Sequence, residues 1–348
     1  MTLSRRRRFA FAVLAVTLAT TAMLVMLLAV DVYLHWRVQD LGAVNVRGYR
    51  GPTVPAKKAG EARIVVLGGS TAFGYGLPYH EAFPHYLEDD LNARATNGRR
   101  YRVINLGAPA QGAYGFLSDL EDYAYLGYDV AIFYEGYNDL GARDLPNAVP
   151  PRDGPNYLLW RRQSPVFRLT GYFPVLPLVF REKAMALRSG GDLDAAYRGR
   201  VVFKPGLATR ATAATLNAAA VVADAVGTQL GKLSADPIGA IGDGGPVETW
   251  THYTGSVLRA VGYARSRGVK IVVVTQPYAS DTHVRQQQAL KRALAEQRGG
   301  DDGVRYVNLG RLIDLRDRSL AYDGLHLVAR ANAMVANALV DPVLALAP

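Results

Sequence analysis

The sequence "RIVVLGGSTAFGYG", residues 63–76, contains the turn on which the fold depends. Apolar, mostly β-branched residues run directly into two glycines, a serine and a threonine, and two further glycines follow. A short apolar run that ends at glycines predicts a buried strand followed by a loop. Such loops either hold phosphate groups or present a nucleophilic serine, and the remaining sequence must decide between these two uses.

Strands and helices alternate along most of the chain after residue 60. Short apolar runs predict strands at 62–69, 101–107, 129–139 (with its following loop), 269–277 and 304–310. Apolar residues at helical spacing predict helices at 82–95, 114–127, 256–268 and 281–300, and a final helix from about Val328. This alternation is typical of an α/β fold in which helices cover both faces of a parallel sheet. In such sheets, sites form outside the carboxyl ends of the strands.

A basic cluster and a long apolar run open the sequence. Four arginines at residues 5–8 precede residues 9–30, which carry no charge and, as a helix, can cross a bilayer core of roughly 30 Å. The arginines predict a cytoplasmic N-terminus, so the rest of the chain is expected in the periplasm or outside the cell. A cleaved signal peptide is the alternative, but its apolar region is normally about 7–15 residues long. We therefore predict an uncleaved, single-pass anchor in the inner membrane.

These features divide the chain into four parts. They are a cytoplasmic basic tail at 1–8, the anchor at 9–30, a linker at 31–60 and a domain at 61–348. An insert at about 141–247 interrupts the alternation within the domain.

The insert has two parts of different composition. Residues 155–180 are rich in aromatic residues and proline, and the alanine-rich residues 208–233 predict a helix. We favour a helical cap packed on the domain. The alternative is that aromatic side chains of the first part contact the membrane surface or an amphiphilic substrate, the candidates being Trp160, Phe167, Tyr172 and Phe173.

Composition excludes several function classes. Apolar residues make up 49% and charged residues 20% of the 348 residues, as in a globular protein with a substantial core. The absence of cysteine excludes disulfides, thiolate metal sites and a cysteine nucleophile. The net charge of +10 is scattered outside the N-terminal cluster, so no nucleic-acid partner is expected. No H-E-x-x-H pair, Walker loop, G-x-G-x-x-G or G-x-S-x-G motif occurs, which argues against a metalloprotease, a phosphate loop and an ordinary α/β-hydrolase.

Four loops at the predicted carboxyl edge of the sheet carry groups that acyl transfer requires. Ser70 offers a hydroxyl that an adjacent base can activate, and Asp323 and His326 can supply an orienting carboxylate and that base. The Asn138 amide, the Gly107 backbone N–H and the N–H of Ser70 are donors that can hold an oxyanion. Together they predict a serine-dependent acyl-transfer site.

Each of these signals also has a structural interpretation when taken alone. Ser70 can act as a helix N-cap, and Asn138 with Asp139 can form an Asx-turn. The D-x-x-H spacing at 323–326 equally suits a metal pair or an exposed turn. Glu135 is either a substrate contact or a polar residue at the end of a strand. Because these signals occur together at one edge of the sheet, we favour a catalytic site over the separate structural interpretations.

In these blocks the sequence resembles the SGNH or GDSL-like hydrolases. "GGST" stands where that family has GDS, "NLG" matches its second block, "GYND" fits G-x-N-D and "DGLH" fits D-x-x-H. The resemblance covers residues 63–141 and about 268–327. It implies a flavodoxin-like three-layer α/β/α sandwich with a central parallel sheet. The sequence departs from the family at Gly69, where aspartate is common.

The resemblance also implies a role for each matched residue. Ser70 is the nucleophile, Asp323 and His326 complete the triad, and Gly107 and Asn138 join Ser70 as oxyanion donors. Metal and cofactor are not required.

We therefore predict a membrane-anchored, extracytoplasmic serine esterase that cleaves an acyl or acetyl ester on a cell-envelope glycan or lipid. One alternative is an O-acyltransferase that uses the same triad on an envelope polysaccharide. Another is an inactive glycan-binding or scaffold protein, which the intact triad disfavours.

Overall fold

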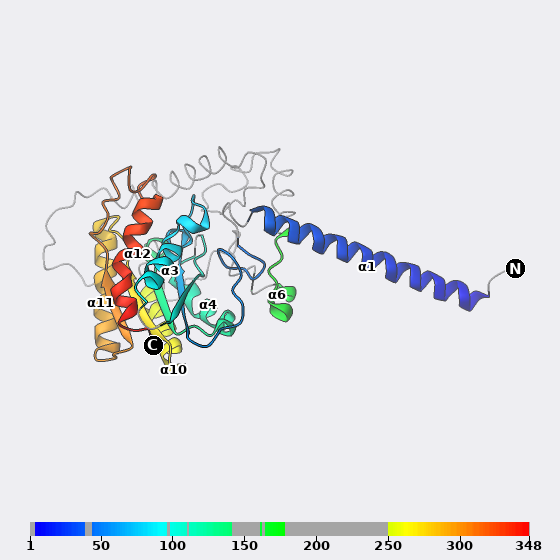
Figure 1. Cartoon of the computed structure of the whole chain (residues 1–348), viewed down its shortest axis with the longest axis horizontal. Helices are drawn as coiled ribbons and strands as arrows, with labels where there is room; N and C mark the ends of the chain where they lie inside the picture. Colours follow the sequence, from blue (N-terminus) through cyan, green and yellow to red (C-terminus); the bar gives the residue numbers. More distant parts are fainter. Residues whose placement is uncertain are drawn as a thin grey trace.

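The fold is built on a five-stranded parallel sheet with helices on both faces (Figure 1). The computed structural model describes residues 4–38, 44–95, 98–109, 111–140, 161, 164–177 and 250–347. The strands are β1 Glu61–Gly68, β2 Arg100–Asn105, β3 Val130–Tyr134, β4 Lys270–Thr275 and β5 Val304–Asn308. These elements confirm the predicted α/β fold.

The strand order, β2-β1-β3-β4-β5, is that of flavodoxin-like sheets. β1 lies between β2 and β3, and its Ile64 pairs with Val103 on one side and Val130 on the other. The chain leaves β1 toward one side to form β2 and then returns to the other side to form β3. This reversal is a topological switch point, and in open α/β sheets ligands bind there, outside the carboxyl ends of the strands.

Two helical layers cover the sheet. On one face lie α3 Phe83–Ala93 and α12 Ala329–Leu344, which contact each other. On the other face lie α4 Phe116–Asp122, α10 Thr251–Ser266 and α11 Asp281–Arg298. Helices thus occur at the five ranges predicted at 82–95, 114–127, 256–268, 281–300 and from about Val328, although α4 is shorter than predicted and α10 begins earlier.

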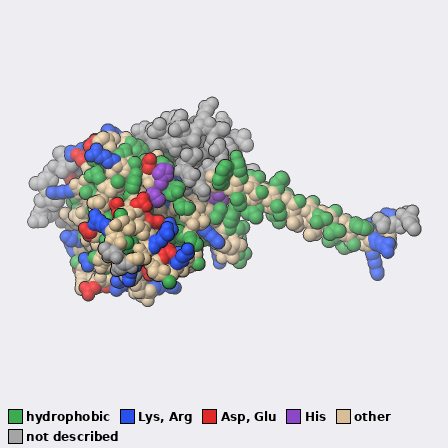
Figure 2. Space-filling model, viewed as in Figure 1, with side chains coloured by type: hydrophobic (Ala, Val, Ile, Leu, Met, Phe, Trp, Pro, Cys, Tyr) green, Lys and Arg blue, Asp and Glu red, His purple; other side chains and the backbone are tan. Residues whose placement is uncertain are grey.

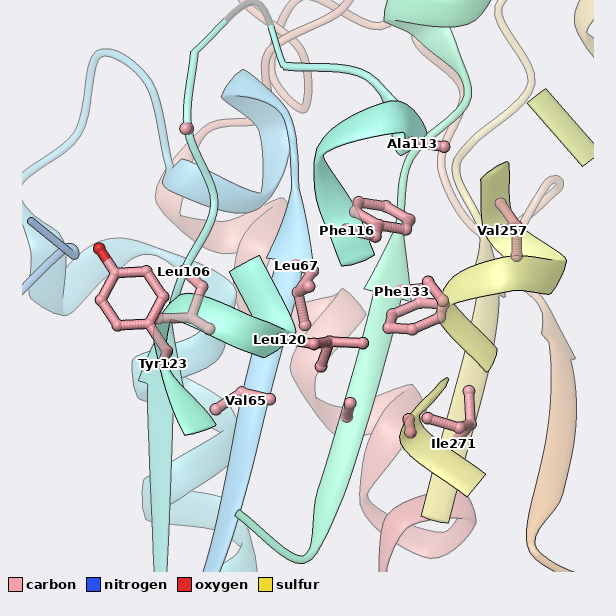
Figure 3. Close-up of a cluster of buried hydrophobic side chains, with 14 of the residues drawn as sticks. Val65, Leu67, Leu106, Ala113, Phe116, Leu120, Tyr123, Phe133, Val257 and Ile271 are labelled. Atoms are coloured by element: carbon pink, nitrogen blue, oxygen red, sulfur yellow. The ribbon is translucent and has the colours of Figure 1, made fainter. Parts of the chain in front are cut away.

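Alternating side chains of the strands feed both layers. In β1, Ile64 and Val66 belong to the apolar cluster shared with α3 and α12, whereas Val65 and Leu67 belong to the cluster shared with α4 and α10. Figure 3 shows the second cluster, in which side chains of α4 lie over β1 and β3. Because β1 is apolar on both faces, it is an interior strand of the sheet and fixes the position of the loop that follows it.

Helix α1 Arg5–Val38 projects from the domain (Figure 1). Among the described helices it alone is long and apolar enough to cross a membrane. Figure 2 shows an apolar rod with basic side chains at its N-terminal end. The helix could equally be a signal sequence by length and composition, so its role as an anchor stays a prediction.

The structure differs from the irregular linker predicted at 31–60. α1 continues to Val38, and from Val44 the chain packs into the core, where Val44 and Tyr49 are each 2% exposed. Asp31 and His35, near the end of the helix, are also buried. Residues 172–176 pack against them and hydrogen-bond to their side chains. The residues predicted as a linker therefore join α1 to the domain by direct contacts.

Two aromatic residues of the described part of the insert pack into the core. Helix α6 Pro165–Thr170 directs Phe167 inward, and Phe173 is fully buried beside it. Tyr172 is half-buried, and its hydroxyl donates to Asp31 Oδ1 at 3.0 Å. Phe167 and Phe173 thus do not form the predicted membrane or substrate contact, since they are packing residues. Trp160 and the predicted helix at 208–233 lie outside the described residues.

Candidate active site

Ser70 stands directly after β1, at the sheet's switch point. It is the first residue of the one-turn helix α2 Ser70–Phe73, which Gly74 ends in a left-handed conformation with φ of 76°. A Cβ on Gly68 would lie 2.2 Å from the carbonyl oxygen of Tyr134. Only glycine at 68 therefore lets the chain pass this close to β3. The side chain of Ser70, two residues later, is partly exposed.

The structure brings Ser70, His326 and Asp323 into one chain of hydrogen bonds. The Ser70 Oγ lies 2.8 Å from His326 Nε2, and His326 Nδ1 lies 2.5 Å from Asp323 Oδ2. The His326 and Asp323 side chains are 2% and 4% exposed. The arrangement of nucleophile, base and orienting carboxylate is the one that serine acyl transfer requires.

A tight loop between β5 and α12 presents the acid and the base. Ala321 and Leu327 form an antiparallel bridge that closes this loop. Inside it, Asp323 Oδ1 accepts the backbone N–H groups of Leu325 at 2.9 Å and His326 at 2.6 Å. One carboxylate therefore shapes the loop with one oxygen and orients the imidazole with the other.

The charge state of Asp323 follows from these contacts. Burial opposes its ionisation, but the hydrogen bonds from the His326 side chain and from the backbone of His326 and Leu325, together with the charge of His326, outweigh burial, so the pKa of Asp323 is lowered. An ionised carboxylate can only accept, which places a proton on His326 Nδ1. The neutral imidazole then has Nε2 free to accept the Ser70 hydroxyl proton.

Two tyrosines contact the imidazole, and sequence reasoning missed both. The ring centroid of Tyr75 lies 5.1 Å from that of His326, and the Tyr322 ring stacks on His326. The Tyr322 hydroxyl donates to the Tyr75 carbonyl at 3.0 Å. A Cβ on Gly76 would lie 2.6 Å from that hydroxyl, which accounts for the second glycine of "GYG". Tyr322 directly precedes Asp323 in the sequence, but nothing in the pattern marks it.

Asn138 reaches the site from the loop after β3. Its Nδ2 donates to the carbonyl of Gln111 at 3.1 Å and to Glu135 Oε1 at 3.2 Å. A Cβ placed on Gly69 would lie 2.2 Å from this nitrogen, so the amide lies against the residue preceding Ser70. The position suits an oxyanion donor beside the nucleophile.

Gly107, which we predicted as an oxyanion donor, has its N–H engaged in the free protein. Its N–H donates to Oδ1 of Asn105 at 2.9 Å, and this bond occupies its single backbone hydrogen. A Cβ at 107 would lie 2.7 Å from the Phe73 nitrogen. Gly107 is therefore a packing residue that lets β2 end close beneath α2.

Glu135 and Asp139 lie beneath the site instead of facing solvent. Each is 2% exposed. Asp139 Oδ2 accepts the N–H of Ala113 at 2.8 Å, which fixes the loop after β2 and agrees with a loop-shaping role. Glu135 is not placed to contact substrate, because the Asn138 turn wraps its carboxylate.

No protein-family model and no curated protein matches the chain. Solved structures similar to it include a lipase/acylhydrolase from Enterococcus faecalis, with 12% identity over 82% of this chain and 97% of that one and a TM-score of 0.43. A GDSL-like lipase from Bacteroides thetaiotaomicron has 12% identity, 84% and 91% coverage and a TM-score of 0.40. An acetylxylan esterase from Geobacillus stearothermophilus has 11% identity, 80% and 93% coverage and a TM-score of 0.40. At these identities the likeness concerns the fold and assigns no substrate.

Proposed function

We propose that the chain is a serine ester hydrolase of the SGNH or GDSL-like type. The observation that carries the proposal is the hydrogen-bonded chain of Ser70, His326 and Asp323 at the switch point of the sheet. Two distant segments of the sequence, at residue 70 and at residues 323–326, converge there with the order of roles that an activated serine needs.

In the proposed reaction, Ser70 Oγ attacks the ester carbonyl carbon while His326 Nε2 takes the hydroxyl proton. The tetrahedral intermediate collapses, the bond to the alcohol breaks, and His326 returns its proton to the departing alcohol oxygen. Water then attacks the acyl carbonyl carbon while His326 Nε2 takes its proton. The bond to Ser70 Oγ breaks, His326 returns the proton to that oxygen, and the acid is released. Ionised Asp323 stabilises the imidazolium in both halves.

The negative oxygen of the intermediate is assigned to the Asn138 amide and the Ser70 N–H. In the free protein one Asn138 hydrogen points to the Gln111 carbonyl, and the oxyanion would replace that acceptor. A charged acceptor makes a stronger hydrogen bond than a neutral carbonyl. Such a donor contributes about 3 kcal/mol to transition-state stabilisation.

For the substrate, we propose an acyl or acetyl ester of a cell-envelope glycan or lipid. The expected location of the domain supports this proposal. Four arginines precede the apolar part of α1, and arginines beside a membrane-spanning helix usually stay on its cytoplasmic side. The domain would then lie on the outer side of the inner membrane, held close to the bilayer by α1.

The decisive test uses the full-length protein in detergent with p-nitrophenyl acetate, a long-chain p-nitrophenyl ester and a fluorophosphonate probe. We expect hydrolysis and covalent labelling by the wild type, and loss of both in Ser70→Ala. Ser319→Ala, in an exposed loop, is the matched control and should keep both. Equal hydrolysis by Ser70→Ala and the wild type would disprove the proposal. Net gain of acetyl on a purified polysaccharide would assign the acyltransferase alternative.

A further inference from the structure

The position before the nucleophile has no room for a side chain. A Cβ on Gly69 would lie 2.2 Å from Asn138 Nδ2, 2.4 Å from Glu135 Oε2 and 3.1 Å from the Gln111 carbonyl oxygen. Real Cβ atoms essentially never have neighbours closer than 3.0 Å, so an aspartate here, as in G-D-S motifs, cannot fit unless the Asn138 and Glu135 side chains move. The space that such a side chain would enter is already occupied by a carboxylate, that of Glu135.

Glu135 reaches this space from the end of the neighbouring strand β3. Its Oε1 accepts the N–H groups of Gly136 and Asn138, each at 2.9 Å, and the Asn138 Nδ2 at 3.2 Å. One oxygen thus holds both the turn that carries Asn138 and its side chain. Its Oε2 lies toward Gly69, whose backbone N–H also acts on this carboxylate.

These contacts decide which end of the Asn138 amide faces Ser70. An amide can present either its NH₂ group or its oxygen, and only the NH₂ group can stabilise an oxyanion. Glu135 Oε1 and the Gln111 carbonyl are both acceptors, so together they select the orientation in which Nδ2 lies beside Gly69. Without Glu135, only the Gln111 carbonyl would oppose a flip that turns the donor away.

We propose that Glu135 is a positioning residue of the oxyanion site and replaces, from β3, the carboxylate that stands before the serine in G-D-S motifs. Gly69 and Glu135 are then one coupled change: glycine at 69 admits the Glu135 carboxylate, and Glu135 supplies the acceptor. The proposal rests on the proposed function, because it assigns Glu135 a role in holding an oxyanion donor.

The coupling leads to a direct test with p-nitrophenyl acetate and the full-length protein. In Glu135→Gln the side chain keeps its shape, but its oxygen is a weaker, neutral acceptor for the Asn138 amide and its NH₂ group puts a donor toward Gly69. We expect kcat to fall about 10-fold to 100-fold with KM unchanged within about twofold. Glu88→Gln is the matched control, since Glu88 also accepts a backbone N–H, that of Val103 at 2.7 Å, but on α3 away from Ser70. It should leave kcat unchanged.

A second set of variants moves the carboxylate from position 135 to position 69. Gly69→Asp alone should abolish activity through the contacts above. Glu135→Ala should lose about 100-fold in kcat. In Gly69→Asp/Glu135→Ala the Asn138 side chain must still shift, because a Cβ at 69 lies 2.2 Å from its Nδ2. Its amide can then donate to the aspartate in the space that Glu135 vacates, so we expect the double variant to recover at least about tenfold of that loss. A double variant no more active than Glu135→Ala would overturn the equivalence of the two positions.

The outcomes separate this inference from the proposed function. If Ser70→Ala is inactive while Glu135→Gln keeps wild-type kcat, or loses activity only through KM, the positioning role is wrong and the esterase stands. If the wild type neither hydrolyses esters nor labels with fluorophosphonate, the proposed function itself fails. Should Glu135→Ala not fold, as shown by circular dichroism, the Glu135→Gln kcat decides alone.

Discussion

The ring of Tyr322 stacks on the imidazole of His326, with centroids 5.9 Å apart and planes inclined by 18°. The Tyr322 hydroxyl is held by the Tyr75 carbonyl, so the stacked ring is itself fixed in place. Asp323 selects the tautomer of His326, whereas the stacked tyrosine restrains the ring plane. Both restraints are needed for Nε2 to stay within hydrogen-bonding distance of Ser70.

Tyr322→Phe and Tyr322→Ala should separate the stacked ring from its hydroxyl. The phenylalanine keeps the stack and loses one hydrogen bond, worth about 1 kcal/mol of stability, with kcat nearly unchanged. The alanine also frees the imidazole, and we expect its kcat to fall at least about tenfold below that of the phenylalanine variant. Steady-state kinetics and thermal unfolding of the three proteins check this. Equal kcat values for the two variants would show that stacking does not position His326.

Asp323→Asn should remove most activity while leaving the loop folded. The asparagine oxygen can still accept the N–H groups of Leu325 and His326, but its amide cannot stabilise an imidazolium and can reverse the tautomer. We expect kcat to fall by a factor on the order of 10³–10⁴, as for other serine triads. Asp317→Asn is the control in the same loop, since the Asp317 side chain accepts hydrogen bonds from Ser319 and should keep wild-type kcat. A smaller loss, within tenfold, would contradict the assigned role of Asp323.

Stability should fall as pH rises through neutrality because of two buried carboxyl groups. Burial raises the pKa of Glu135 to about 7, and burial followed by the charge of Glu135 raises that of Asp139 to about 8. Unfolded carboxyl groups ionise near pH 4, so between about pH 4 and 8 the folded chain binds more protons. This stabilisation is complete below pH 4 and is lost as pH rises through the folded values.

Asp139→Asn isolates this effect, because the amide is neutral at every pH. The Tm of this variant minus that of the wild type should increase from pH 5 to pH 9, which differential scanning fluorimetry can measure. The free-energy difference changes by at most about 1.4 kcal/mol per pH unit for one group. A difference that stays flat or decreases over this range would contradict the raised pKa of Asp139.

The sheet and the triad could be predicted from sequence because each depends on a local pattern. Runs such as residues 64–67 are apolar on both faces, which only a buried strand satisfies, and the chain order of strands and helices then restricts the topology. Ser70, Asp323 and His326 could be placed together because loops after parallel strands meet at one edge.

The oxyanion site was harder to predict because it depends on distances between backbones. Gly107 follows β2 as expected, but the Asn105 side chain folds back onto its N–H, and no sequence pattern reports that bond. Glu135 was visible only as a polar residue at a strand end. Glu135 matters because Gly69, after β1, has no side chain and so leaves room for the Glu135 carboxylate, which follows β3. Only the three-dimensional structure reveals this proximity.

Arg161 should be essential for stability, because it joins the insert to α4 through buried charges. Its guanidinium donates to Asp119 Oδ1 and, at 2.8 Å, to Asp122 Oδ2, and it lies over the Tyr123 ring. Arg161 and Asp119 are 2% and 0% exposed. Arg161→Met leaves the Asp119 charge buried without its cation, and we expect a loss of about 3–5 kcal/mol.

Urea unfolding of the detergent-solubilised protein measures this loss, and Arg161→Met/Asp119→Leu is its matched partner. Because the double variant removes both buried charges, it should recover most of the lost free energy. A double variant less stable than Arg161→Met would show that the ion pair itself, and not the uncompensated charge, dominates.

The mature protein should retain α1, because the end of this helix is built into the domain. Asp31 accepts the backbone N–H groups of Val175 at 3.0 Å and Leu176 at 2.8 Å, and His35 Nε2 lies 2.7 Å from the Phe173 carbonyl oxygen. Both side chains are at most 4% exposed, directly after the apolar run. A peptidase needs an extended, accessible segment at that point, and α1 is helical and docked there.

Intact-mass measurement of protein extracted from membranes should therefore find the N-terminal residues present. Asp31→Ala should lower Tm and speed proteolysis near residues 31–60, whereas Val32→Ala, an exposed neighbour on the same helix, should change neither. A mature mass that begins near Asp31 would show that the helix is a signal sequence.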